Sequence, residues 1–164
     1  MQARPATPDD AEAIARIYNQ GIQESATLET RLRSAEDVRR WFDGRHPIVV
    51  AEDNGQVLAF AATFPYRPNR DCYAGVAEFS IYADAQARGR GAGRLAMQAI
   101  IAAAGQAGFW KLLSRVFPEN TASRALLRSV GFREVGVYEK HGKRDGVLRD
   151  AVIVERLLDG AARP

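Results

Sequence analysis

Cysteine is nearly absent from this sequence, with Cys72 alone among 164 residues. A single thiol excludes an internal disulfide framework and is typical of a reducing compartment, so we predict a cytoplasmic location with Cys72 as an inert free thiol. The chain also lacks any run of eighteen apolar residues, which predicts no membrane-spanning helix and no membrane partner. Its start, MQARPATPDD, has no apolar export signal, so we expect no export.

Excess charge of one sign is scarce as well. The formal net charge is only +3, and the basic residues are spread along the chain, so we expect no nucleic-acid partner. The apolar content of 46% and charged content of 26% are ordinary for a globular protein. The length predicts a single domain over residues 1–158, followed by a short tail over 159–164.

Hydrophobic periodicity and turn signals predict a mixed-sheet α/β fold. Strand-like runs and amphipathic runs follow one another in the order β-α-α-β-β-β-α-β-α-β-β, which is neither a doubly wound parallel sheet nor a barrel. The sequence Asp53-Asn54-Gly55 is a hairpin signature, and Ser34 with Asp37 resembles a helix capping box. We expect strands at 2–4, 48–52, 56–64, 76–82, 112–117, 132–138 and 147–157, and helices at about 8–22, 34–44, 94–104 and 120–130.

The segment QARGRGAG, residues 86–93, lies between the strand-like run 76–82 and the helix-like run 94–104. Glycines at alternate positions let the backbone turn sharply. The amides of such a turn and of the first helical turn have no partner within the helix, so with the helix dipole they form a seat for a phosphate or pyrophosphate. The arginines suit a polyanion. A glycine-rich turn without a ligand is the alternative.

Two common phosphate-binding motifs do not fit this segment. The P-loop requires Lys-Ser or Lys-Thr after its last glycine, whereas Arg94-Leu95 follows here. A dinucleotide motif starting at Gly89 would need glycine at position 94 and an acid about twenty residues on, but residues 102–117 contain none. The form R-x-x-G-x-G over 88–93 instead resembles the acetyl-coenzyme A (acetyl-CoA) loop of the GCN5-related N-acetyltransferases (GNAT).

The element order, this loop, and the later Asn120 and Gly131-Phe132 together resemble the GNAT acyl-CoA N-acyltransferase fold over residues 2–158. Other segments are similar to the phosphinothricin N-acetyltransferase group within it: 26–30, 65–68, Tyr73, 78–82, 120–123, 136–137 and 146–150. The resemblance implies an enzyme that uses acetyl-CoA and no metal, and that forms a homodimer. It implies direct attack, in a ternary complex, by the α-amino group of phosphinothricin, methionine sulfoximine, methionine sulfone or arsinothricin.

The same resemblance assigns the cofactor site. The backbone of Ile81, Tyr82 and Ala83 should pair with the pantetheine amides as an added strand would, and the Ile81 amide should bind the thioester oxygen. Asn120 should contact the pantetheine arm, with a helix cap as the alternative. Ser123 should lie near the far end of the cofactor, as should Arg124 unless it is a surface charge. The pyrophosphate should bind the loop residues Arg88, Gly89, Arg90, Gly91, Ala92, Gly93 and Arg94.

Glu78 is the candidate catalytic base, together with Ile81 as the second catalytic residue. Glu78 shares one strand face with Val76 and Ser80. An isolated carboxylate within a strand flanked by helices is costly to bury in its charged form, and this cost favours accepting a proton. The family's proposed base also falls here. The alternatives are a satisfied structural carboxylate and an edge position that faces water.

The acceptor's carboxylate or phosphinate calls for a bidentate arginine, and Arg67 and Arg70 lie in the loop before the Glu78 strand. Tyr66 and Tyr73 could wall the pocket. The loop after the first helix, which covers the acceptor site in this family, contributes Thr27 and Glu29. For each of these residues the alternative is an ordinary surface position.

This chain departs from the family at two places. Leu127 stands where relatives often carry a tyrosine or histidine that protonates the leaving thiolate, so that role is empty or filled elsewhere, with His141 as a candidate. In the closing hairpin, Val147-Leu148 replaces a frequent aromatic, which predicts a smaller or differently shaped acceptor. Two other functions stay open: acetylation of a polyamine, an aminoglycoside or a protein N-terminus, and a CoA-binding sensor without turnover.

Overall fold

The structure is a computed structural model that describes residues 1–159. Its strands form one seven-stranded sheet in the order β1-β2-β3-β4-β5-β7-β6, in which β4 and β5 are parallel and all other neighbours antiparallel. The predicted element order is confirmed. The strands are β1 (Gln2–Pro5), β2 (Ile48–Asp53), β3 (Gln56–Pro65), β4 (Val76–Ala83), β5 (Lys111–Val116), β6 (Arg133–Arg144) and β7 (Val147–Leu157). The helices are α1 (Ala11–Gln23), α2 (Ala35–Arg39), α3 (Ala92–Gln106) and α4 (Thr121–Ser129), with single 3-10 turns η1 (Pro8–Asp10), η2 (Asp71–Tyr73) and η3 (Ala85–Ala87).

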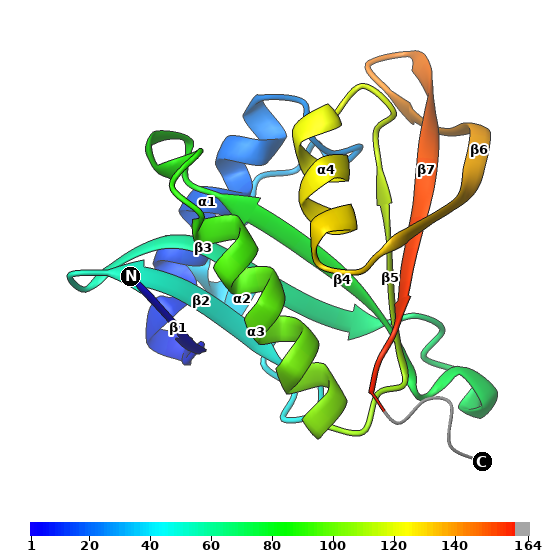
Figure 1. The fold of residues 1–164 in the computed structure, drawn as a ribbon. Helices are drawn as coiled ribbons and strands as arrows, with labels where there is room; N and C mark the ends of the chain where they lie inside the picture. The colour runs from blue at the N-terminus through cyan, green and yellow to red at the C-terminus, as the bar shows by residue number, and fades with distance from the viewer. Residues whose placement is uncertain (160–164) are drawn as a thin grey trace.

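Helices cover both faces of the sheet, with α3 and α4 on the near face in Figure 1 and α1 and α2 behind it. Successive strand residues point to opposite faces, so each central strand serves two cores. Phe60 of β3 packs toward α1, whereas its neighbours Ala59 and Ala61 pack toward Met97 and Ile100 of α3. Small residues on the α3 side let this helix lie close to the sheet. The short connection from Ala83 to Ala92 places the N-terminus of α3 near the end of β4.

The second helix is shorter than predicted. Its capping box is present, with the Ser34 amide donating to Asp37 at 2.9 Å and the Asp37 amide donating to Ser34 Oγ at 3.1 Å. However, α2 ends at Arg39 rather than continuing to Gly44. Within the segment predicted as helix, the Asp43 carboxylate accepts hydrogen bonds from the amides of Arg45 and His46 at 2.8 Å, a local arrangement that competes with helix.

The closing hairpin is longer than predicted. The strand expected to end at Tyr138 continues as β6 to Arg144, because residues 142–144 pair with 147–149 of β7. Asp145 and Gly146 both have positive φ, at 50° and 77°, and close the hairpin as Asn54 and Gly55 close the predicted β2–β3 hairpin. The extra length carries the hairpin tip to the loop that follows α1.

No helix within residues 1–159 is long and apolar enough to cross a membrane. The single domain over 1–158 stays a prediction, and of the tail predicted over 159–164 all but Asp159 lies outside the described residues.

Candidate functional site: a cleft between two diverging strands

A cleft opens where β4 and β5 separate. The two strands pair only from Val76 with Lys111 to Glu78 with Leu113, and beyond these residues they diverge. Ser114 Oγ bridges the start of the gap by donating to the Phe79 carbonyl at 2.8 Å. The resulting cleft has a volume of about 1040 Å³ and is lined by residues 78–83 of β4 and 114–117 after the split. The β4 edge that faces it has no partner strand, which suits an extended ligand.

The turn from β4 into α3 borders this cleft. Buried Asp84 accepts a hydrogen bond from the Gln86 amide at 2.9 Å and pairs with Arg16, whose hydrogen bond lowers the pKa of the Asp84 carboxyl. Gly89 and Gly91 then have φ of 77° and 88°, in the region that glycine tolerates best. An added Cβ at either position would meet nothing within 4 Å, so the space above the turn is open.

The amides of this turn are free to bind a ligand. Of the amides of residues 88–94, that of Arg90 donates to the Ala87 carbonyl at 3.3 Å, and no hydrogen bond within residues 1–159 uses the others. They gather at the N-terminus of the 15-residue α3, where the helix dipole favours negative charge. This arrangement fits a diphosphate. The amides belong to Arg88, Gly89, Gly91, Ala92, Gly93 and Arg94.

The arginines of the turn already have partners. Arg88 forms an ion pair with Glu24 at the end of α1, and Arg94 donates to a hydroxyl group of α4 at 2.9 Å. Both line the cleft. Arg90 pairs instead with Asp53 of the β2–β3 hairpin at 3.2 Å, and it is the one residue of 88–94 that does not line the cleft.

Glu78 lies at the point where the strands separate. Its side chain is 25% exposed, lines the cleft, and receives a hydrogen bond from Arg115 Nη2 at 3.1 Å. The expectation of an isolated carboxylate is therefore wrong, because β5 supplies a guanidinium. Ile81, Tyr82 and Ala83 follow along the cleft edge.

Tyr82 closes the inner wall of the cleft. It packs edge-on against Tyr18 at 5.2 Å between ring centroids, and burial raises the pKa of Tyr82 to about 12. A Cβ at Gly21 of α1 would lie 2.7 Å from the Tyr82 ring, so α1 approaches the strand at a residue without a side chain. Tyr82 thus remains a neutral phenol at pH 7.

The α4 side of the cleft carries Asn120 and Ser123. Asn120 caps α4 by accepting the Ser123 amide at 3.1 Å, and both residues line the cleft. The capping alternative for Asn120 is confirmed, and it leaves the Nδ2 group without a partner in residues 1–159. Arg124 does not line the cleft, because it pairs with Glu134 through two bonds of 2.8 and 2.9 Å.

Leu127 is 1% exposed, lines the cleft as part of the core, and offers no proton. His141 also lines the cleft, from the β6–β7 hairpin, with its ring 4.8 Å from that of Tyr138.

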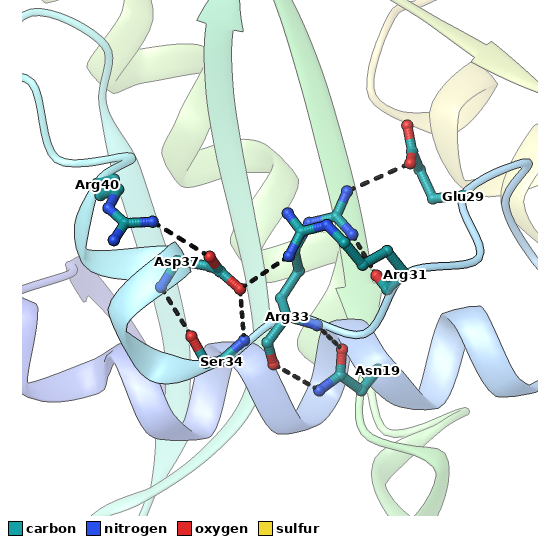
Figure 2. Close-up of polar contacts among 7 residues, drawn as sticks. All are labelled: Asn19, Glu29, Arg31, Arg33, Ser34, Asp37 and Arg40. Carbon is teal, nitrogen blue, oxygen red and sulfur yellow. Dashed lines mark hydrogen bonds and ion pairs between the residues drawn. The ribbon is translucent and has the colours of Figure 1, made fainter.

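The loop after α1 forms the remaining wall, and Thr27 and Glu29 line the cleft from it. Arg144 holds this loop by donating to the carbonyls of Ile22, Thr27 and Glu29 at 2.7, 2.5 and 2.8 Å. Figure 2 shows the far side of the loop, where the Arg33 backbone exchanges two 2.8 Å bonds with the Asn19 side chain. The side chain of Arg33 also pairs with Glu29 at 3.3 Å.

Residues 13–132 match the model of the Acetyltransferase (GNAT) family. The chain belongs to this family. It is 36% identical over 165 residues to YwnH of Bacillus subtilis (strain 168), covering 96% of this chain and 99% of that protein. It is 31% identical over 163 residues to the L-methionine sulfoximine/L-methionine sulfone acetyltransferase of Pseudomonas paraeruginosa (strain DSM 24068 / PA7), covering 95% and 94% of the two chains.

A solved structure shares this architecture. The phosphinothricin acetyltransferase (Pat) of Sinorhizobium meliloti, in complex with AcCoA, superposes with a TM-score of 0.86 at 28% identity over 96% of this chain and 88% of that one. The predicted GNAT fold is confirmed.

Four predicted acceptor residues lie outside the GNAT cleft. Tyr66 and Tyr73 pack edge to face at 5.5 Å in the β3–β4 loop, and the Arg67 guanidinium lies 5.3 Å from the Tyr66 ring. These residues contact one another rather than the cleft, and Arg70 does not line it either. In a single copy of the chain they do not wall the site around Glu78, so their role in acceptor binding stays a prediction.

Sequence reasoning missed several residues of the GNAT cleft. Ser80 lines the cleft, and although strand alternation already placed it on the face of Glu78, it was not assigned to the site. Phe64 lies opposite Glu78 in the β3–β4 register. The position of Arg115 beside Glu78 in the cleft depends on the parallel register of β4 with β5. Neither register has a local sequence signal.

Proposed function

We propose that this GNAT chain transfers the acetyl group of acetyl-CoA to the α-amino group of a small amino acid or analogue, of the phosphinothricin, methionine sulfoximine, methionine sulfone or arsinothricin type. The amine attacks directly in a ternary complex. One observation carries this proposal: the free amides at the α3 N-terminus and the Glu78 carboxylate line the same cleft. The relatives named for methionine sulfoximine and phosphinothricin, at 31% and 28% identity, support the acceptor class.

The donor end of the cleft binds acetyl-CoA through backbone groups. The amides of 88–89 and 91–94 bind the diphosphate, and the free β4 edge over Ile81–Ala83 binds the pantetheine amides. Asn120 contributes its Nδ2 group to that arm, next to Ser123. When bound, acetyl-CoA supplies the acetyl group as a thioester. The Ile81 amide is placed along the same edge to stabilise negative charge on the thioester oxygen.

Glu78 prepares the acceptor. The α-amino group of an amino acid has a pKa of about 8 or above and is mostly protonated at neutral pH, so a carboxylate must take its proton before attack. Glu78 lies at the inner end of the free β4 edge and is partly open to the cleft. Leu127 cannot protonate the thiolate, and a thiol with a pKa near 8.5 leaves without a dedicated acid.

The test has two parts. Isothermal titration with acetyl-CoA measures the donor site, and the absence of heat at millimolar ligand would end the proposal. A thiol-release assay then compares phosphinothricin, methionine sulfoximine, methionine sulfone, free amino acids, polyamines and an aminoglycoside. We expect turnover with the amino acids. Tight acetyl-CoA binding without thiol release for any amine would favour the sensor alternative.

We further propose a homodimer. The β6–β7 hairpin exposes apolar side chains along the outer edge of the sheet, at Val135, Val137, Tyr138, Val147 and Leu148. Exposed apolar surface of this kind is typical of an interface. Sedimentation velocity at micromolar concentration should give twice the chain mass, and a monomer would contradict the proposal.

A cytoplasmic location is also proposed, because Cys72 is exposed and unpaired and such thiols persist in reducing compartments. Cell fractionation tests it, and recovery in an exported fraction would contradict it.

A further inference from the structure

Arg115 and Glu78 form a pair of opposite charges at the acceptor end of the cleft. Residue 113 lies opposite Glu78 in the β4–β5 register, and Arg115 follows on the same face of β5. Its Nη2 lies 3.1 Å from Glu78 Oε2, and both side chains line the cleft. The Arg115 side chain is 46% exposed and that of Glu78 is 25% exposed, so a ligand can reach both groups.

Arg115 is the arginine available to an anion at this end. Among the described residues that line the cleft, the other arginines are Arg88 and Arg94, and both border the α3 turn. Arg88 is paired with Glu24, and Arg94 is bonded to Ser129. Within residues 1–159, the Arg115 guanidinium has one hydrogen-bond partner, the Glu78 carboxylate, through a single bond.

An α-amino acid matches this pair. Its ammonium nitrogen and carboxylate oxygens are separated by only two bonds to Cα and one C–O bond, which places them roughly 3 Å apart. The acceptor can therefore exchange one ion pair for two: its ammonium group faces Glu78, and its carboxylate takes the two-pronged guanidinium of Arg115. No charge is left without a partner during this exchange. A simple amine would remove Glu78 from Arg115 and offer the guanidinium nothing.

We propose that Arg115 binds the α-carboxylate of the acceptor and makes the enzyme selective for α-amino acids over primary amines. This inference rests on the proposed acetyltransferase function. It assigns the anion-binding role to β5 rather than to Arg67 and Arg70, which the sequence suggested and which lie outside the cleft.

The experiment compares two acceptors that differ only in the carboxylate. L-methionine sulfone and 3-(methylsulfonyl)propan-1-amine are each titrated in the thiol-release assay at saturating acetyl-CoA. For the wild type we expect kcat/KM to favour the amino acid by roughly 10- to 100-fold, the range of a hydrogen-bonded charge pair. In R115Q the preference should fall to near unity, through a higher KM for the amino acid. R115K should keep part of it.

The matched control is R39Q, whose arginine is 49% exposed, pairs with Glu36 at 3.4 Å on α2 and does not line the cleft. Its preference should equal that of the wild type. The inference is overturned if wild type does not discriminate, or if R115Q loses both acceptors by the same factor, which would mean that Arg115 acts only on Glu78. If R115Q does not fold, the ratio of kcat/KM for the two acceptors, measured for the wild type and for R115K, still tests the inference. Absence of turnover with every amine would overturn the proposed function itself.

Discussion

Arg144 fastens the closing hairpin to the loop that covers the acceptor end of the cleft, and its removal should be costly. Its side chain is 10% exposed and donates to the carbonyls of Ile22, Thr27 and Glu29. A net contribution of about 1.5–3 kcal/mol is typical of one hydrogen bond to a charged group. Three bonds from one guanidinium are not additive, so we expect R144M to lower the free energy of unfolding by about 3 kcal/mol.

Urea denaturation measures this loss directly, and thermal denaturation should show a Tm lower by about 6–12 °C for a domain of this size. R144K should lose less stability than R144M, since a lysine ammonium can keep some of the hydrogen bonds to the carbonyls. Lysine also has no group that corresponds to the buried Arg144 Nε, which has no acceptor within residues 1–159. Lys143 is the control, because it is exposed and adjacent in the same strand, and its side chain forms no hydrogen bond or ion pair within residues 1–159. K143M should match the wild type within about 0.5 kcal/mol, the usual range for a surface change.

The same variant should affect the two substrates differently. Because Thr27 and Glu29 line the cleft and belong to the proposed acceptor site, R144M should raise the KM of the acceptor by about tenfold, which corresponds to roughly 1.4 kcal/mol of lost positioning. The Kd of acetyl-CoA should change by less than about twofold, since the α3 turn does not contact Arg144. An R144M variant as stable as wild type would refute the reasoning, as would an equal loss for both ligands.

Three further predictions follow from other parts of the fold. E78Q should lower kcat by about 100-fold or more and remove the acid limb of the pH–rate profile, while calorimetry finds acetyl-CoA binding intact; an unchanged profile would exclude Glu78 as base. G91V should weaken acetyl-CoA binding at least about tenfold because φ is 88° there, whereas G105A in the same helix should leave Kd unchanged and add about 0.5–1 kcal/mol of stability. A hydrogen bond from Arg4 lowers the pKa of the Asp10 carboxyl. Its stabilising effect is therefore full above the unfolded pKa of about 4 and is lost as pH falls through the folded value, so urea titrations of D10N below pH 4 should show a flatter decline than wild type.

Local sequence signals predicted the parts of this fold that local geometry determines. The Asn120 cap, the Ser34–Asp37 box and the Asn54-Gly55 turn each depend on residues within a few positions of one another. The glycine turn is of the same kind, since positive φ at Gly89 and Gly91 and the following helix are enough to present free amides. For this reason the donor end of the cleft was visible in the sequence.

The acceptor end was not visible, because it depends on contacts between distant segments. Arg144 reaches its carbonyls across more than a hundred residues of sequence, from a strand extension that polar residues 139–144 did not suggest. The cluster of Tyr66, Arg67 and Tyr73 looked like a pocket wall because it precedes the Glu78 strand, yet its rings and guanidinium pack on one another. Proximity in sequence to a functional strand therefore did not place a side chain in the cleft.

The mistaken expectation about Glu78 has a mechanistic consequence. While the Glu78 carboxylate accepts the hydrogen bond from Arg115, one of its oxygens is occupied by that donor and is not available to the amine of an acceptor. An acceptor whose carboxylate takes over Arg115 frees Glu78 at the same moment that it presents its ammonium group to it. A primary amine without a carboxylate can engage Glu78 only by taking it from Arg115, and it leaves the guanidinium without a partner. With the roles proposed for Arg115 and Glu78, recognition of the acceptor and removal of its proton depend on the same ion pair, located where β4 and β5 separate.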